Sequence, residues 1–205
     1  MVGSLVGGMG GLGRGGFGGA AKGGGAGGGA RGTAQALGGF LSTVAESGLA
    51  TALQSLGLGS LEGKSPEEIV LALLDALCGP GSTIDDVDLR NALSTLLDEL
   101  LDGANDFAAA ELELQEAAAS LDQIIADLFG NYIFERFQTT MYARLEAKIG
   151  AAASACMDSL RDYIHGQLRL EGALRNLTKL DWAGASGAAL VNEILERTLA
   201  VFSIP

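Results

Sequence analysis

The sequence is poor in the residues that most often carry chemistry or crosslinks. It has one histidine, two cysteines and one tryptophan among 205 residues, and aromatic residues make up only 5%. Two cysteines in a chain of this length specify no disulfide framework, so we interpret Cys78 and Cys156 as buried thiols of a cytoplasmic protein. With so few rings, the core has to be built mainly from Leu, Ala, Ile and Val, and the chain is long enough for one such domain.

Complete catalytic and ligand-binding motifs are also missing. Gly8–Gly13 (GMGGLG) has the spacing of a dinucleotide-binding turn, but no strand precedes it, and chance produces such a match in so glycine-rich a region. Gly63–Ser65 resembles the end of a phosphate loop, yet Leu58 stands where that loop needs glycine. Asp85–Asp88 begins like a calcium loop whose sixth and twelfth positions are then an arginine and a leucine. We therefore expect no enzyme activity, no cofactor and no metal site.

The single histidine and the absence of targeting signals restrict the classes of protein to which this chain can belong. His165 has no cysteine or acid at motif spacing, so the sequence predicts a surface or capping residue rather than a metal ligand or a catalytic base. No charge precedes Arg14 and glycine interrupts the early apolar run, which is unlike a secretory signal. Because no uninterrupted apolar run reaches about 18 residues, we expect no membrane-spanning helix and a cytoplasmic protein.

Glycine and positive charge are concentrated at the N-terminus. Residues 1–32 hold 17 of the 32 glycines and three cations, Arg14, Lys22 and Arg31, with no acid. The net charge of the chain is −12, so the remaining residues carry −15 and should repel nucleic acid and anionic lipid. Glycine loses much backbone entropy on ordering and brings no side chain to compensate. We therefore predict a flexible basic tail at 1–32 and an acidic helical domain at 33–205.

From Thr33 onward, apolar residues recur at helical spacing, and no segment has the pattern of a strand. The clearest local signal is a capping box, with Ser65 as N-cap, Pro66 at the first helical position and Glu68 three residues after the serine. That helix should stop at Gly79-Pro80. We predict an all-α bundle of about five to six helices, with helical stretches near residues 33–56, 66–78, 84–101, 106–149, 152–177 and 187–202.

Several of these stretches carry glycines or rings that predict how they pack. Gly38, Gly39 and Gly48 weaken the first one, so we expect a loosely held helix rather than close packing. Gly130-Asn131 should kink or divide the long stretch at 106–149. The stretch at 84–101 should bury one face, namely Val87, Leu93, Leu96, Leu97 and Leu100. The rings of LFGNYIFERF are expected in the core rather than in a partner groove; they are Phe129, Tyr132, Phe134 and Phe137.

Three segments, in this order behind the glycine-rich start, resemble a known family. They are EEIVLALLDAL (67–77), LRDYIHGQL (160–168) and LVNEILERTLAVF (190–202). The pattern resembles QatB, the small helical subunit of the Qat anti-phage defence system. The resemblance implies an operon that also encodes an ATPase (QatA), a QueC-like enzyme (QatC) and a TatD-like nuclease (QatD). It implies QatC as the binding partner and QatA as a second candidate partner.

The tail is the segment to which we assign partner binding. A glycine chain that orders on binding can thread a narrow active site, where side chains would clash. With the resemblance, this predicts a non-catalytic subunit that presents its tail to the QueC-like enzyme, as a candidate substrate for modification. The residues assigned to this role are Gly3, Gly7, Gly8, Gly10, Gly11, Leu12, Arg14 and Phe17.

Two alternatives for the tail stay open at this stage. Residues 1–61 combine Gly, Ala and Leu at small-residue spacings, which is also typical of helices that associate in membranes, so the chain could act as a membrane-active effector. Against this stand the charges of Arg14, Lys22, Arg31 and Glu46. The other alternative is a plain scaffold whose tail is only a linker.

Overall fold

Helices form all of the regular structure that the computed structural model describes, which covers residues 29–79 and 83–174. Within these residues there are seven α-helices, two single 3-10 turns and no β-strand, which confirms the all-α fold. Residues 1–28 of the tail and the expected helix at 187–202 lie outside the described residues. The α-helices are α1 (Gly29–Ser47), α2 (Leu49–Ser55), α3 (Pro66–Cys78), α4 (Ile84–Leu100), α5 (Phe107–Ala118), α6 (Leu121–Ile149) and α7 (Ala153–Leu174).

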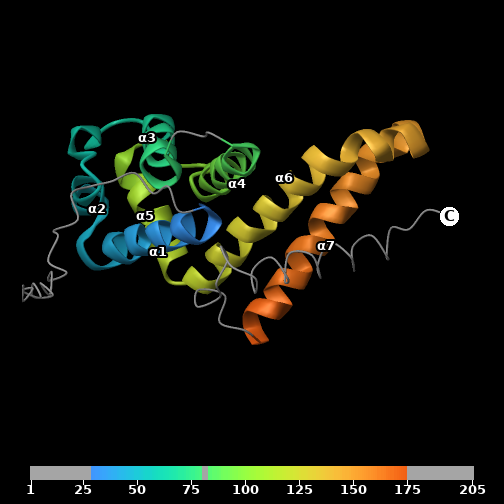
Figure 1. Cartoon of the computed structure of the whole chain (residues 1–205). Helices are drawn as coiled ribbons and strands as arrows, with labels where there is room; N and C mark the ends of the chain where they lie inside the picture. Colours follow the sequence, from blue (N-terminus) through green and yellow to red (C-terminus); the bar gives the residue numbers. More distant parts are fainter. Residues whose placement is uncertain (1–28, 80–82, 175–205) are drawn as a thin grey trace, which may run out of the picture.

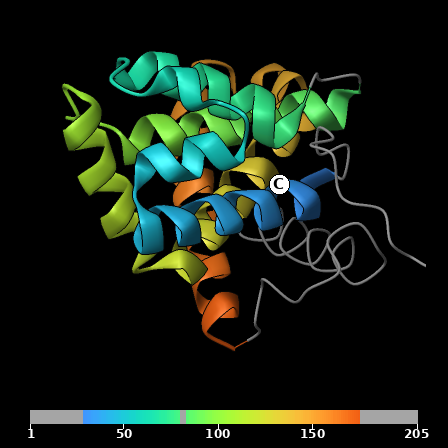
Figure 2. The same cartoon turned by 90° about the vertical axis from the view of Figure 1, so that its left-hand side faces the viewer.

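The helices are arranged as a body with a long helical pair beside it. Helices α1 to α5 gather into the body, and α6 and α7 run antiparallel to one another next to it (Figure 1). Helix α6 belongs to both parts, because it packs against α4 and α1 as well as against α7. Helix α7 packs mainly on α6 and lies behind the body when the molecule is turned (Figure 2).

Capping groups fix where several helices begin. At α3 the Glu68 amide donates to Ser65 Oγ over 3.4 Å and the Ser65 amide donates to Glu68 Oε2 over 3.2 Å, which confirms the predicted capping box. Gly79, with φ of 69°, ends this helix as expected. Thr83 and Asp86 form a second capping box at α4, which the sequence reading missed.

The helix breaks differ from those expected. Gly48, with φ of 84°, separates α1 from α2, and Glu111 Oε1 accepts from the Leu49 amide at 3.2 Å to start the second helix. The long stretch divides at Ala119-Ser120, where i-to-i−3 hydrogen bonds tighten the end of α5. Gly130-Asn131 does not divide the stretch as the sequence allowed, since both residues lie inside the continuous helix α6.

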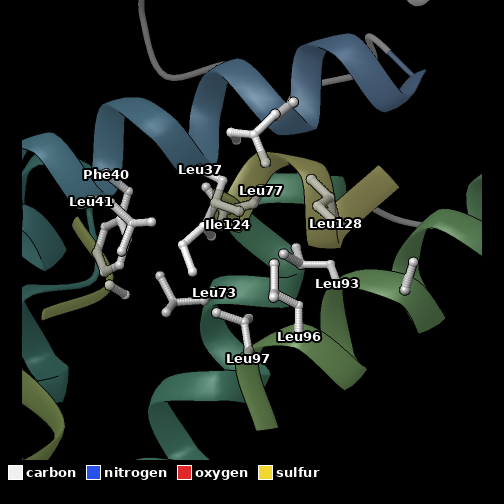
Figure 3. Packing of buried hydrophobic residues seen from close by; sticks show 14 of the residues in the cluster. Leu37, Phe40, Leu41, Leu73, Leu77, Leu93, Leu96, Leu97, Ile124 and Leu128 are labelled. Atoms are coloured by element: carbon white, nitrogen blue, oxygen red, sulfur yellow. The ribbon is translucent and has the colours of Figure 1, made fainter. Parts of the chain in front are cut away.

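The first helix is part of the core rather than loosely held. Leu37, Leu41 and Val44 are 0% exposed, and Figure 3 shows Leu37 of α1 beside Leu77 of α3 and Ile124 of α6. Each buried leucine of α1 stabilises the fold by about 2 kcal/mol, whereas each glycine inside the helix costs about 1 kcal/mol. The packing of α1 therefore outweighs the effect of its glycines. The expectation of a weakly held helix is therefore wrong.

The buried face of α4 also departs from the expected one. Leu93, Leu96 and Leu97 are buried, but Val87 is 49% exposed and Asp88 is 3% exposed. The helix is rotated so that Asp88, not Val87, faces α6, where the hydroxyl of Thr139 donates to it. The rings around Gly130 lie as predicted in or against the core: Phe129 and Phe137 are buried, and Tyr132 and Phe134 are half-buried.

Candidate functional site

The eight tail residues assigned to partner binding (Gly3, Gly7, Gly8, Gly10, Gly11, Leu12, Arg14 and Phe17) lie outside the described residues. The description begins at Gly29, which is the first residue of α1 and falls within the expected tail of 1–32. What the structure describes is therefore the base of the tail. The side chains around the start of α1 determine how the helical body can bind this segment.

The start of α1 is attached to the end of α3. Thr33 is 1% exposed, and its Oγ1 lies 3.3 Å from the carbonyl oxygen of Leu77 and 3.9 Å from Cys78 Sγ. Burial raises the pKa of the Cys78 thiol, and the nearby charge of Asp86 adds to the effect. Cys78 and Cys156 are both free and half-buried, so the two thiols form no disulfide, as expected.

Acidic side chains gather next to this attachment, where α4 begins and α6 passes. Asp86 and Asp88 of α4 and Glu135 of α6, together with Tyr132 of α6, are called the acidic seam below. Burial raises the pKa of Tyr132, and the charges of Asp88 and then Asp86 raise it further. Burial also raises the pKa of Glu135; a hydrogen bond from Asn91 and the charge of Arg161 oppose this, and the charge of Asp88 adds to it. The seam therefore brings carboxyl groups of two helices together in a half-buried environment.

Asp88 is the most deeply buried member of the seam, and one of its oxygens is unpaired. Thr139 Oγ1 donates to Asp88 Oδ1 over 2.9 Å, while within the described part of the chain nothing donates to Oδ2. Arg90 of the same helix is engaged elsewhere, since it donates to Asp75 at 2.6 Å and to the Gly79 carbonyl at 3.2 Å. A buried carboxylate with a free lone pair is costly, because burial removes the water that would solvate it.

A second polar cluster lies in an open depression of about 490 Å³ between α6 and α7. His165 of α7 is at its centre, with Nδ1 3.3 Å from Asp127 Oδ1 and Nε2 3.1 Å from Asn131 Oδ1. Arg161 donates to Glu99 of α4 at 2.7 Å and to Asn131 at 3.3 Å. Arg169 donates to Asp127 at 3.2 Å, so the cluster ties α7 to both α6 and α4.

The chemistry of this cluster is that of a structural network. Both ring nitrogens of His165 face oxygen atoms, and the tautomer decides which of them donates, to Asp127 or to Asn131. None of the described residues places a serine, threonine or cysteine nucleophile on the ring, and no group of three or more potential metal ligands occurs among them. The expectation of a surface or capping role for His165 is wrong, because its side chain is 15% exposed and joins two helices.

The sequence analysis did not predict the cluster around His165, although Gly130 is the one residue that indicates it. A Cβ at Gly130 would lie 2.7 Å from His165 Cε1, so the imidazole occupies the space that any other residue would fill. A glycine inside an apolar helical pattern is more often a close approach of this kind than a break when the helix continues beyond it. Asp127 and Asn131 are more than 30 residues from His165, which is why no local motif revealed the cluster.

Comparison with known proteins identifies the family. Residues 18–202 match the model of the family described as "Qat anti-phage system associated protein QatB". The chain belongs to the QatB family. It therefore has a role in the Qat anti-phage system. No curated protein and no solved structure gave a significant match.

The family match does not test the role assigned to the tail, whereas the helix lengths bear on the membrane alternative. The match begins at residue 18, after all eight assigned tail residues, so QatB membership carries no argument about them. For the membrane alternative, no helix among the described residues is long and apolar enough to cross a bilayer.

Proposed function

We propose that this QatB-family chain is a non-catalytic subunit that binds the QueC-like enzyme of the Qat system and presents its glycine-rich tail to that enzyme's active site. The tail would be a substrate for modification there. The observation that carries the proposal is the attachment of α1: the glycine-rich segment ends where Thr33 and Leu37 fix the chain to the core. The glycine-rich tail is therefore attached to the body at a fixed position, the start of α1.

The chemistry of the tail suits a narrow nucleotide pocket. A QueC-like enzyme activates a carboxylate with ATP and joins it to an amine. A backbone almost without side chains can pass where a bulkier segment would clash, and its few larger residues would set the register. The QueC-like enzyme is the first candidate partner and the ATPase of the same system the second.

A pair of matched tail variants tests the threading step. Gly10→Val places a branched side chain among the assigned residues, and Gly24→Val places the same side chain in the tail outside them. We expect Gly10→Val to abolish protection against phage in cells that express the whole operon, with Gly24→Val close to the parent. Both proteins should still co-purify with the QueC-like enzyme, because we propose that the helical body holds the enzyme while the tail is presented. Equal protection by all three chains would contradict the proposal.

The membrane alternative is disfavoured by the packing of α1 and α2. Their apolar side chains Leu37, Leu41, Leu49 and Leu53 are 0% exposed, so insertion would first have to extract them from the core. Dye release from liposomes by the full chain, compared with a chain lacking residues 1–28, separates the two functions. Release that depends on the tail would favour the membrane effector.

A further inference from the structure

The start of α1 lies against the helices that carry the acidic seam. Thr33 of α1 contacts the Leu77 carbonyl at the end of α3, and α1 also packs against α4 and α6. Cys78 at the end of α3 lies between them, with its thiol 3.9 Å from the Thr33 hydroxyl and within reach of the charges of Arg90 and Asp86 of α4. A chain that leaves α1 backwards from Gly29 therefore starts next to the seam.

We propose that the acidic seam is a docking site for the basic N-terminal tail of this same chain. Lys22, seven residues before Gly29, would bring its ammonium group over Glu135 and Asp88, and Arg14 would provide a second cation. The docked tail is a resting state that the partner enzyme has to displace. The docking itself does not depend on whether the tail is a substrate.

Charge and the unpaired oxygen of Asp88 argue for this occupant. The tail has three cations and no acid, whereas the rest of the chain carries a net charge of −15. Asp88 is 3% exposed and its Oδ2 accepts from nothing in the described residues, so a donor from elsewhere would complete its hydrogen bonding. Asp86, Tyr132 and Glu135 are half-buried and open the seam to solvent above it. A cation seated there would offset part of the cost of the buried carboxylate.

Reach and composition permit the contact. Seven extended residues span at most about 25 Å, and α1 packs directly against both α4 and α6, the helices that carry the seam. Residues 23–29 are Gly-Gly-Gly-Ala-Gly-Gly-Gly, so no side chain larger than a methyl obstructs the turn back toward the seam. The contact is electrostatic, and salt should weaken it.

Trypsin cleavage of the isolated full chain tests the docking without any partner. The rates of cleavage after Lys22 and Arg14 are followed by mass spectrometry in the parent, in Asp88→Asn and in Asp98→Asn. Asp98→Asn is the matched control, because it removes the same charge from an exposed position on the same helix. Asparagine at 88 can still accept the hydrogen bond from Thr139.

We expect Asp88→Asn to accelerate cleavage after Lys22 about threefold, with Asp98→Asn like the parent. Added salt should remove the difference. Faster cleavage at Arg90 or Arg136 would report unfolding of the body, and Glu135→Gln then replaces Asp88→Asn as the deciding variant. Equal rates after Lys22 in all folded variants would overturn the proposal. Protection that increases with protein concentration would also overturn it, because the tail would then dock on a second copy.

Discussion

Gly130 offers the sharpest test of how α6 and α7 are held together. Alanine at this position places a Cβ 2.7 Å from His165 Cε1 and 2.8 Å from Nδ1, which is closer than such atoms can approach. The imidazole has to move, and it then loses its contacts to Asp127 and Asn131. The backbone of α6 is regular at Gly130, so no left-handed conformation complicates the substitution.

The magnitude follows from two opposing effects. Replacing glycine by alanine inside a helix stabilises by about 1 kcal/mol. Displacing the imidazole from its two partly buried polar contacts, one of them with the Asp127 carboxylate, costs about 2–4 kcal/mol. We therefore expect Gly130→Ala to lower the free energy of unfolding by about 1–3 kcal/mol. Urea denaturation followed by circular dichroism measures it.

Gly166→Ala and a double variant provide the controls. Gly166 lies inside α7 with no atom within 4 Å of an added Cβ, so alanine there should stabilise by up to about 1 kcal/mol. In a His165→Ala background the obstacle is gone, and Gly130→Ala should then stabilise as well. If Gly130→Ala stabilises the parent as Gly166→Ala does, the imidazole does not lie against Gly130 and the network described here is wrong.

Three further substitutions test pH dependence, capping and the core. Burial, with a contribution from Asp88, raises the pKa of Glu135. The stability gained from its protonated form is therefore present at low pH and lost as pH rises through the folded-state pKa. Glu135→Gln should flatten this loss of urea resistance as the pH is raised above the ordinary glutamate pKa of 4.5. Ser65→Ala removes the side-chain acceptor of the capping box and should cost about 1 kcal/mol, whereas Ser60→Ala at an exposed site should change little in the same titration. Leu73→Asp and Leu97→Asp each put an unpaired charge at a position that is 0% exposed and should abolish the cooperative thermal transition, while Leu112→Asp at a 63% exposed position should retain it.

Local signals in the sequence were sufficient for much of the fold. The capping box at Ser65 and Glu68 and the stop at Gly79 depend on residues that are neighbours in the chain, so their chemistry can be read without a structure. The all-α class follows from periodicity that persists through the whole domain.

The remaining features depend on residues that are distant in the sequence. Val87 and Asp88 are adjacent, and only the position of Thr139 on α6 decides that the acid is buried and the valine is not. Gly130 has the composition of a break, and only the approach of His165 from α7 shows that it is a packing site. The acidic seam likewise brings together residues of α4 and α6 that are about 50 positions apart in the sequence, and no local motif predicts this.

The intact mass of the chain, followed by fragmentation of its N-terminus, tests the central claim most directly. The protein would be purified from cells that express the complete Qat operon and from cells in which only the QueC-like enzyme is inactivated. We predict an added mass or a truncation confined to residues 1–32 that requires the active enzyme. An unchanged tail in both preparations, from cells that are protected against phage, would contradict the account of the tail as a substrate.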